Sequence, residues 1–515
     1  MKSRLDYTSK NIVWGYVSSG ATVLFSFITR TIFIYTIGIE FLGINGLFTS
    51  ILGVLSLTEL GIGAAMNYSL YKPVAEENIE KVKSLMLLYK KAYQWIAAII
   101  TILGLLILPF LNCLIEGAEH IEYIKLYYLV FLFNTVSSYF VSYKYSLINA
   151  EQKNYIVTNI TTVFNIVMNG VQIMLLVVFH NYLIYLIVQA CFQLAQKVYT
   201  SYYINKKYPY LKDKEIKPLD KAEHSRIVSD VKALICHKIG EISVNQTDNI
   251  IISAFINVVT VGLVSNYMLV VTTVNTFVNI IFNGMIGSLG NLFATTDKEK
   301  QYQVFKVMDF VDFWIFSFSS VAIFSLVQPF ISIMWGKECL VAIPVVFLIV
   351  LNNYMVGQRI SINNIKVAGG LFEKDKYLAI IQSIVNLIVS IICAMKWGLI
   401  GVYIGTIVSG LVPSIIRPYI VFKHLLERSA KRYYVVYGIR LLITMCLAFG
   451  CYKVNCLILQ ELNWQNFILT AVLTTILPNA ILLLINIRTD EFGYLCYLLK
   501  QLLNKMMRGG RECNH

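Results

Sequence analysis

A few charged side chains fall within long apolar stretches of this chain, where they could bind an anion or carry a coupling ion. Arg30 lies inside the apolar stretch 12–37, Glu59 inside another, and Asp248 inside a run of polar residues at 245–249. A charge within a membrane-spanning helix costs a few kcal/mol or more, so it usually faces a cavity or a partner. The planar fork of an arginine binds phosphate oxygens bidentately, whereas a buried carboxylate can bind a proton or a sodium ion.

Each of these residues also has a structural interpretation. Arg30 lies about six residues from the end of its helix and could extend outward to the membrane surface. Asp248 could belong to a hydrogen-bonded polar cluster that joins helices, and Glu59 could do the same. We expect Arg30 to bind the anionic part of a substrate. We expect Asp248 and Glu59 to serve gating or ion coupling.

Four more charged residues are candidates because of their positions. Lys144 and Arg359 lie near predicted cytoplasmic helix ends, where they could receive an anionic headgroup or simply reach the membrane surface. Lys238 and Glu241 lie three residues apart on the same predicted helix as Asp248 and can form a local pair. We assign the first two to substrate binding and the second two to gating.

Composition places the chain in the membrane. Of its 515 residues, 57% are hydrophobic and only 14% are charged, and the mean hydropathy is +0.66. Soluble domains of this length are far more polar. The net charge of +14 arises from basic residues in short loops between apolar stretches, so it does not indicate nucleic acid. The ten cysteines form no CxxC pair or His/Cys cluster, so we expect neither a metal site nor a cofactor.

Apolar runs between polar breaks predict an all-α polytopic protein with about fourteen transmembrane helices. They lie near 11–36, 43–67, 92–115, 124–148, 155–179, 182–204, 234–256, 263–287, 309–333, 341–365, 377–396, 398–421, 434–454 and 465–487. The loops alternate in charge. One side holds only Lys125, Lys337, Lys396 and Lys453, and with Arg30 inside the membrane, all other basic residues fall on the opposite side. The positive-inside rule therefore predicts cytoplasmic N- and C-termini.

The two halves of the chain resemble each other at a constant offset in residue number. Gly43 matches Gly262, Trp95 matches Trp314 and Asn134 matches Asn353, and the two numbers of each pair differ by 219. Six spans per half would make parallel repeats, related by an axis along the membrane normal. The expected organisation is a six-helix lobe at 1–204, a basic cytoplasmic linker at 205–233, a second six-helix lobe at 234–421, and an appended helix pair with its tail at 422–515. The basic linker is expected to touch anionic membrane lipids.

Under this offset Arg30 corresponds to Asn249, next to Asp248. The two charges therefore occupy nearly equivalent places in opposite repeats. We infer that they pair across a central cavity in one state and separate when substrate arrives.

Several short motifs resemble those of one transporter superfamily. They are RTIF at 30–33, GIEFLG at 38–43, LTELGIG at 57–63, YKPVA at 71–75, YK at 143–144 with AEQKNY at 150–155, and TDNIIIS at 247–253. The chain resembles the flippase superfamily of multidrug exporters, lipid II flippases and polysaccharide flippases. The resemblance is closest to the Wzx-like flippases of O-antigen and capsule.

That resemblance implies two six-helix lobes, two additional helices and a cationic cavity. It also implies an undecaprenyl-diphosphate-linked oligosaccharide as substrate and the bacterial cytoplasmic membrane as the location. Either H+ or Na+ would be the coupling ion, and a polysaccharide polymerase is an expected partner. The alternatives are a drug or lipid II exporter of the same superfamily, or a membrane polysaccharide polymerase or ligase.

An enzyme is the weaker alternative. Polymerases and ligases of this kind need a large outer loop, and the longest predicted outer loops, near 116–123 and 455–465, are short. The sequence also lacks a P-loop, a G-x-S-x-G elbow and paired metal-binding motifs. We therefore expect a transporter and no catalytic residue.

The predicted topology can be tested by labelling single cysteines in intact cells. Residues 205–230 and the C-terminal tail should be protected from an impermeant reagent, whereas 455–465 should react. Labelling of 205–230 from outside would contradict both the span count and the two lobes.

Overall fold

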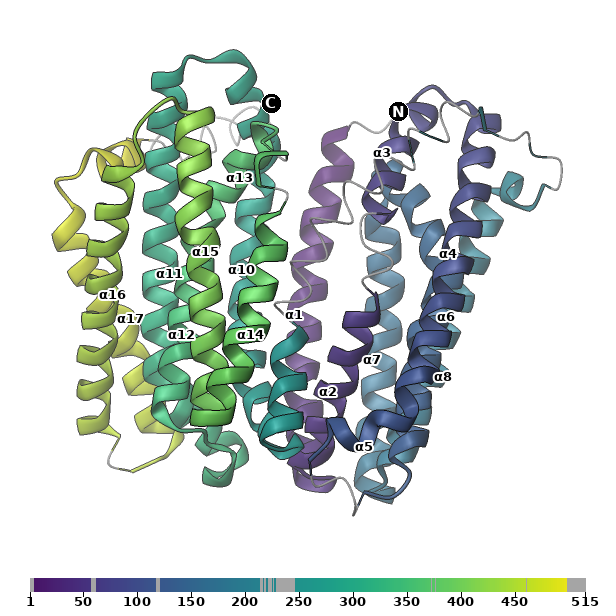
Figure 1. The fold of residues 1–515 in the computed structure, drawn as a ribbon, viewed down its shortest axis with the longest axis horizontal. Coiled ribbons are helices and arrows are strands. Elements are labelled where there is room, and N and C mark those ends of the chain that lie inside the picture. The colour runs from purple at the N-terminus through teal and green to yellow at the C-terminus, as the bar shows by residue number, and fades with distance from the viewer. Residues whose placement is uncertain are drawn as a thin grey trace, which may run out of the picture. The chain divides into compact units, whose positions relative to one another are not determined.

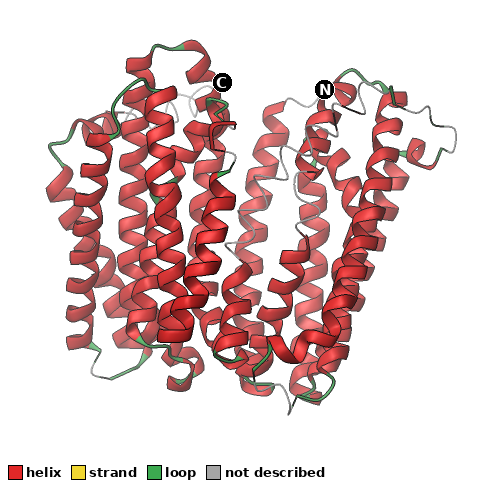
Figure 2. Cartoon of the chain, viewed as in Figure 1, coloured by secondary structure: helices red, strands yellow, loops and turns green. Residues whose placement is uncertain are grey.

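The computed structural model describes residues 4–56, 62–116, 121–213, 216, 219–220, 225, 227, 246–371, 373–375, 377–459 and 461–497. Within these ranges the chain is built of helices joined by short turns, and no strand occurs there (Figure 2). Eleven of these described helices are long and apolar enough to cross a membrane. The chain is therefore an integral, multi-pass membrane protein, and the predicted all-helical fold is confirmed.

From α1 to α8, and again from α10 onward, the helices follow one another with few residues between them (Figure 1). In chain order they are α1 Arg4–Thr36, α2 Ile39–Leu55, α3 Ile62–Ala75, α4 Ile79–Ile107, α5 Leu111–Leu114, α6 Ile124–Ala150, α7 Asn154–Phe179, α8 Tyr182–Lys207, α10 Val258–Thr295, α11 Lys298–Trp335, α12 Ile343–Gly357, α13 Ile360–Ala368, α14 Leu378–Trp397, α15 Leu399–His424, α16 Lys431–Ile458 and α17 Trp464–Asn486. Short 3-10 turns include η2 Leu108–Phe110, η4 Pro209–Lys212, η5 Lys337–Cys339 and η6 Glu373–Asp375.

Most predicted spans coincide with one of the eleven apolar helices. The span predicted at 182–204 is the helix α8, which is not among the eleven. The span at 43–67 corresponds to α2 and part of α3, with residues between them outside the description. Most of the span at 234–256 also lies outside the described residues.

The chain forms two compact units. One consists of Met1–Ser265 with Tyr377–Gly405, and the other of Asn266–Lys376 with Thr406–His515. Helix α14 thus belongs to the unit that contains the N-terminal helices. The boundaries expected for two lobes, a linker and an appended pair stay a prediction.

The offset between the repeats reappears in the helix boundaries. Helices α2, α4 and α6 begin at 39, 79 and 124, and α10, α11 and α12 begin at 258, 298 and 343, which is the same difference in each case. The N-caps match as well. Asn78 accepts a hydrogen bond from the Lys81 amide at 3.1 Å, and Asp297 accepts one from the Lys300 amide at 3.2 Å. Equivalent residues therefore begin equivalent helices.

A close contact between α2 and α10 joins equivalent residues of the two repeats. A Cβ on Gly43 would lie 1.9 Å from the carbonyl oxygen of Val258, and a Cβ on Gly262 would lie 2.2 Å from that of Ile39. Val258 is the repeat equivalent of Ile39, as Gly262 is of Gly43. The contact is therefore reciprocal, as a two-fold relation between repeats requires. Small residues at such crossings let two membrane helices approach backbone to backbone.

Aromatic side chains fix α8 against α1, α2 and α6 near its first residue. The ring of Tyr182 lies 4.7 Å from that of Phe41 and 4.8 Å from that of Tyr127. The Tyr182 hydroxyl donates to Asn45 Oδ1 at 3.0 Å, so this buried polar tip is satisfied. Phe33 on α1 packs on Tyr185 at 5.1 Å.

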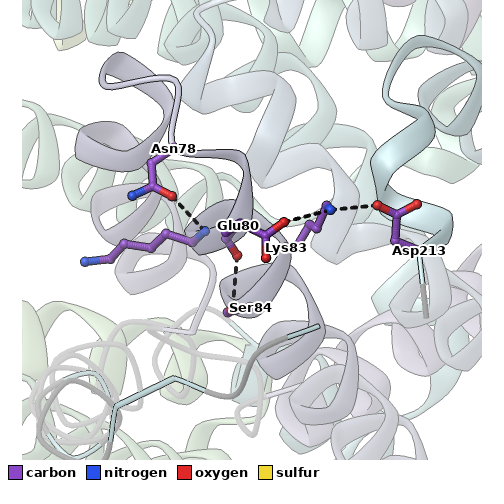
Figure 3. Close-up of polar contacts among 6 residues, drawn as sticks. Asn78, Glu80, Lys83, Ser84 and Asp213 are labelled. Carbon is purple, nitrogen blue, oxygen red and sulfur yellow. Dashed lines mark hydrogen bonds and ion pairs between the residues drawn. The ribbon is translucent and has the colours of Figure 1, made fainter. Parts of the chain in front are cut away.

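At its other end, the chain that follows α8 is attached to α4 (Figure 3). Lys83 Nζ lies 2.7 Å from Asp213 Oδ2 and 3.0 Å from Glu80 Oε1. The Ser84 hydroxyl donates to the Glu80 carbonyl at 3.0 Å and so continues this polar network along α4. Both ends of α8 are therefore held by neighbouring helices.

The glycine contact predicts a large effect of one methyl group. Gly43→Ala or Gly262→Ala should destabilise the protein by about 1–3 kcal/mol, because the added Cβ meets backbone rather than a movable side chain. Gly170→Ala on α7 is the control, since nothing lies within 4 Å of its Cβ position. Thermal unfolding of the detergent-solubilised variants measures the difference. Equal melting temperatures for all three variants would contradict the close contact.

Candidate functional site

Arg30 lies on α1, six residues before the last residue of that helix, Thr36. Its Nη1 donates to Ser265 Oγ at 3.1 Å, and the Ser265 hydroxyl donates in turn to the carbonyl of Gly262 at 2.7 Å. Tyr185 on α8 is close enough to interact electrostatically with the guanidinium. The charge thus sits against the first turns of α10, beside the glycine contact.

The residue equivalent to Arg30 makes the equivalent contact in the other direction. Asn249 Nδ2 donates to Ser50 Oγ on α2 at 2.9 Å, and it lies 4.0 Å from the Cβ position of Gly46. Gly46 is the repeat equivalent of Ser265. The helical segment at 246–255 therefore contacts α2 as α1 contacts α10. The first repeat thus has the charged Arg30 at the position where the second repeat has the neutral amide of Asn249.

Lys144 is buried between α6 and α8, with only 6% of its surface exposed. Its ammonium donates to Ser201 Oγ at 2.6 Å and to Asn205 Oδ1 at 2.9 Å. It lies six residues before the end of α6 at Ala150, which is about 9 Å along the helix. Of the lysines buried between these two helices, Lys144 is therefore the one nearer to their predicted cytoplasmic end.

Lys197 is a buried cation that the sequence pattern did not single out. It is 8% exposed, and its ammonium donates to the carbonyl of Asn134 at 2.8 Å and to Ser137 Oγ at 2.9 Å, both on α6. Ten residues separate it from the end of α8 at Lys207, or about 15 Å. Its two partners, Asn134 and Ser137, lie near the middle of α6, which runs from Ile124 to Ala150. Lys197 is thus at mid-depth. The sequence alone had placed it among the basic residues of the cytoplasmic side.

A polar ridge on α8 connects the three cations. The regular spacing of its residues is visible in the sequence and could have revealed Lys197. Side chains every four residues along α8 follow one ridge of the helix surface. Here that ridge is polar throughout, and its members are Tyr185, Gln189, Gln193, Lys197, Ser201 and Asn205. Tyr185 lies near Arg30, while Ser201 and Asn205 bind Lys144. The cations therefore occupy three depths along one continuous polar path.

A cavity of about 430 Å³ lies beside the middle of this ridge. It is lined by Thr49, Leu52, Gly53, Ser56, Val130, Phe131, Asn134, Thr135, Ser138, Tyr139, Leu186, Gln189, Gln193 and Lys197. Its lining includes amides, hydroxyls and aromatic rings. Such a surface can donate and accept hydrogen bonds while it stacks on an apolar ring face.

Neither Lys144 nor Lys197 has an acidic partner among the described residues. The ion pairs that the structure forms there involve other cations, such as Lys83 with Asp213 and Lys153 with Glu151. Lys144 instead lies near Lys90 and Lys212, which repel it. A buried ammonium held only by neutral groups is costly, and an anion in the adjoining space would offset that cost.

The ends of α6 and α8 are joined outside the membrane-spanning segments. The Tyr208 hydroxyl donates to Glu151 Oε2 at 2.5 Å, and Glu151 also pairs with Lys153. Burial raises the pKa of Tyr208 strongly, and the neighbouring Glu151 carboxylate raises it further. Burial likewise raises the pKa of Tyr210 to about 12, with a smaller effect of Glu151. Both tyrosines therefore stay protonated donors at any physiological pH.

Asp248 belongs to a polar segment that contacts two other helices of its unit. The preceding Thr247 donates to Asn386 Oδ1 on α14 at 3.0 Å, and Tyr403 on α15 interacts electrostatically with Asp248. The pairing of Asp248 with Arg30 stays a prediction. The other gating candidates, Glu59, Lys238 and Glu241, lie outside the described residues.

Arg359 lies in the other compact unit, at the turn between α12 and α13. It is 6% exposed, and its Nη1 donates to the carbonyl of Gly410 at 2.7 Å and to Ser414 Oγ at 3.3 Å. Arg417 nearby pairs with Asp375 at 3.1 Å. The role of Arg359 in binding substrate stays a prediction. Within the described part of the chain, no His, Cys, Asp and Glu side chains cluster as metal ligands would.

Comparisons with known proteins identify the fold. No protein-family model and no curated protein matches the chain. Among solved structures, the lipid II flippase MurJ in an inward closed conformation aligns over 92% of this chain and 100% of its own, with TM-score 0.61 and 16% identity. An inward-facing multidrug resistance MATE family transporter of the MOP superfamily aligns over 79% and 96%, with TM-score 0.59 and 15% identity.

A third similar structure is a mutant of the Vibrio cholerae MATE transporter VcmN. It covers 82% of this chain and 99% of its own, with TM-score 0.54 and 13% identity. At these identities the likeness establishes the fold alone. The chain has the fold of MOP-superfamily transporters.

A double-mutant cycle tests the predicted pair of Arg30 and Asp248. Asp248→Asn alone should lower transport and stability, because it would leave a buried cation without its partner, which typically costs several kcal/mol. Adding Arg30→Asn should restore stability but not substrate recognition. Cysteines at the two positions should cross-link in one access state only. Additive effects together with no cross-linking would rule the pair out.

Proposed function

We propose that this chain is a flippase that moves a polyprenyl-diphosphate-linked oligosaccharide from the cytoplasmic to the outer leaflet of a bacterial membrane. The observation that carries the proposal is the set of three cations at three depths, Lys144, Lys197 and Arg30, along one polar ridge of α8. The product would serve the synthesis of a cell-surface polysaccharide. Alternating access of two lobes would expose the site first to one side and then to the other.

The chemistry of the substrate explains why cations are needed at several depths. A diphosphate cannot enter hydrocarbon unaided, because the loss of its hydration is prohibitively costly. An ammonium near the entrance, a second at mid-depth and a guanidinium near the far end would replace that hydration in steps. Lysine acts as a compact point charge, and arginine adds a bidentate grip on phosphate oxygens.

The glycan would occupy the polar cavity beside the ridge. Gln189, Gln193 and Asn134 supply amides there, and Tyr139 supplies an aromatic ring. The Tyr139 hydroxyl donates to Ser56 Oγ at 3.0 Å, so its ring is held in one orientation. Sugars carry hydroxyls that pair with amides and apolar faces that pack on rings.

The cationic path disfavours a drug exporter whose substrates are organic cations, since like charges in a low-dielectric site repel strongly. Lipid II also carries a polyprenyl diphosphate, so the cations suit either lipid. The glycan that the polar cavity accepts would distinguish the two substrates. Coupling to H+ or Na+ would involve Asp248 and Glu59.

Removal of the guanidinium should stop transport. In a strain that depends on this protein, Arg30→Ala should lower surface polysaccharide at least about tenfold, the loss expected from removing charge-assisted hydrogen bonds worth about 1.5–3 kcal/mol. Arg30→Lys should retain part of the activity, because it keeps the charge but loses the fork. Quantitative surface staining at matched membrane levels provides the measurement.

Arg432→Ala is the matched control, because Arg432 is an exposed arginine at the start of α16. It should leave export unchanged. Normal export by the Arg30→Ala protein would show that Arg30 has only a structural role, such as its contact with Ser265. Lethal cell-wall failure with intact surface polysaccharide would instead indicate lipid II as the substrate.

A further inference from the structure

We propose that the prenyl chain of the transported lipid lies in a groove between α6 and α8, with its diphosphate on Lys197. The inference rests on the proposed flippase function and adds the place where the lipid chain binds. It assigns α6 and α8 as the helices past which the substrate moves with its chain still in the membrane.

The groove has a volume of about 430 Å³, within the roughly 300–1,000 Å³ typical of ligand pockets. It is lined by Phe133, Val136, Ser137, Phe140, Val141, Leu194, Lys197, Val198 and Ser201. Most of these side chains are apolar. Phe133, Phe140 and Val198 are 51%, 54% and 60% exposed, so an apolar ligand can reach them. An isoprenoid chain suits this surface.

Lys197 lines both this groove and the polar cavity described above. Its ammonium has two neutral partners, the carbonyl of Asn134 and the hydroxyl of Ser137, and its third N–H has no partner among the described residues. One buried cation thus separates an apolar space from a polar one. A lipid-linked oligosaccharide has an apolar chain, an anionic diphosphate and a polar glycan in that order, which matches the order of the apolar groove, Lys197 and the polar cavity.

Lys144 extends the cationic edge of the groove toward the predicted cytoplasmic side. Ser201 lines the groove and accepts a hydrogen bond from Lys144 Nζ at 2.6 Å. Ser201 follows Lys197 by one turn of α8, about 6 Å along its axis. A diphosphate leaving Lys144 therefore reaches Lys197 by a short step along one helix, while the chain stays in the groove.

The depth of Lys197 favours a lipid in transit over a resident phospholipid. The headgroup of a resident phospholipid stays at the membrane surface, whereas Lys197 lies about 15 Å from the end of α8. An anionic lipid whose headgroup reaches this depth is one that the protein is moving. Charge complementarity and depth together point to the substrate as the occupant.

Binding to the purified full-length protein in phosphatidylcholine nanodiscs tests the site, with undecaprenyl diphosphate as the probe. Lys197→Gln should weaken binding at least about tenfold, as expected when a charge-assisted hydrogen bond is lost. Lys197→Arg should keep most of the affinity, because the charge remains. Added phosphatidylglycerol should compete poorly, since its headgroup does not reach mid-depth.

A variant at the exposed wall tests the groove without touching the charge. Val198→Trp should fill the groove and weaken binding at least about tenfold, while Lys197 remains in place. The control is Ile187→Trp, because Ile187 is 46% exposed on the same helix and lines neither cavity. It should bind like the wild type. Since Val198 lies on the exposed face, this test holds even if the Lys197 variants fold poorly.

The outcomes separate this inference from the function on which it rests. Normal transport and binding by the Lys197→Gln and Val198→Trp proteins would overturn the groove and leave the flippase standing. Equal competition by phosphatidylglycerol would make the groove a phospholipid site. Failure of the wild-type protein to bind undecaprenyl diphosphate at all would overturn the proposed function itself.

Discussion

Hydrocarbon offers no hydrogen bonds, so each charged group within the membrane-spanning helices must find its partners in the protein. This constraint organises the N-terminal helices. Lys144 on α6 reaches to Ser201 and Asn205 on α8, while Lys197 on α8 reaches to Asn134 and Ser137 on α6. The two lysines therefore link α6 and α8 in both directions through neutral partners. Their charges are not neutralised by these partners, so they can attract an anion.

The backbone contact between α2 and α10 places Arg30 in the same way. Because Gly43 and Gly262 carry no Cβ, the two helices meet closely enough for α1 to reach Ser265 on α10. The equivalent segment of the second repeat reaches Ser50 on α2 through Asn249. The two repeats therefore make equivalent contacts with each other. The contacts differ in one side chain, because the first repeat has Arg30 where the second has Asn249. The two repeats thus share this contact and differ in the charge that they place at it.

Helices α6 and α8 combine a polar surface and an apolar one. One surface faces a cavity rich in amides and hydroxyls, and the other is an apolar groove with exposed phenylalanines. Lys197 lies on the boundary. Aromatic packing around Tyr182 at one end and the Tyr208–Glu151 hydrogen bond at the other hold the pair in register. A rigid pair with two surfaces suits an amphiphilic substrate better than a purely polar or apolar one.

The sequence by itself determined the membrane class, most spans and the offset between the repeats. Hydropathy and helix starts depend on residues close together in the chain, so they can be read from the sequence alone. It also singled out Arg30, which lies inside an apolar run, and Lys144, which lies near a predicted helix end. Lys197 escaped it, since a lysine in a span of moderate hydropathy looks like an ordinary basic helix end. Only the tertiary structure decided which neutral groups hold each cation and that Lys197 borders two cavities. Those facts depend on neighbouring helices that are about 60 residues apart in the chain, as Asn134 and Lys197 are.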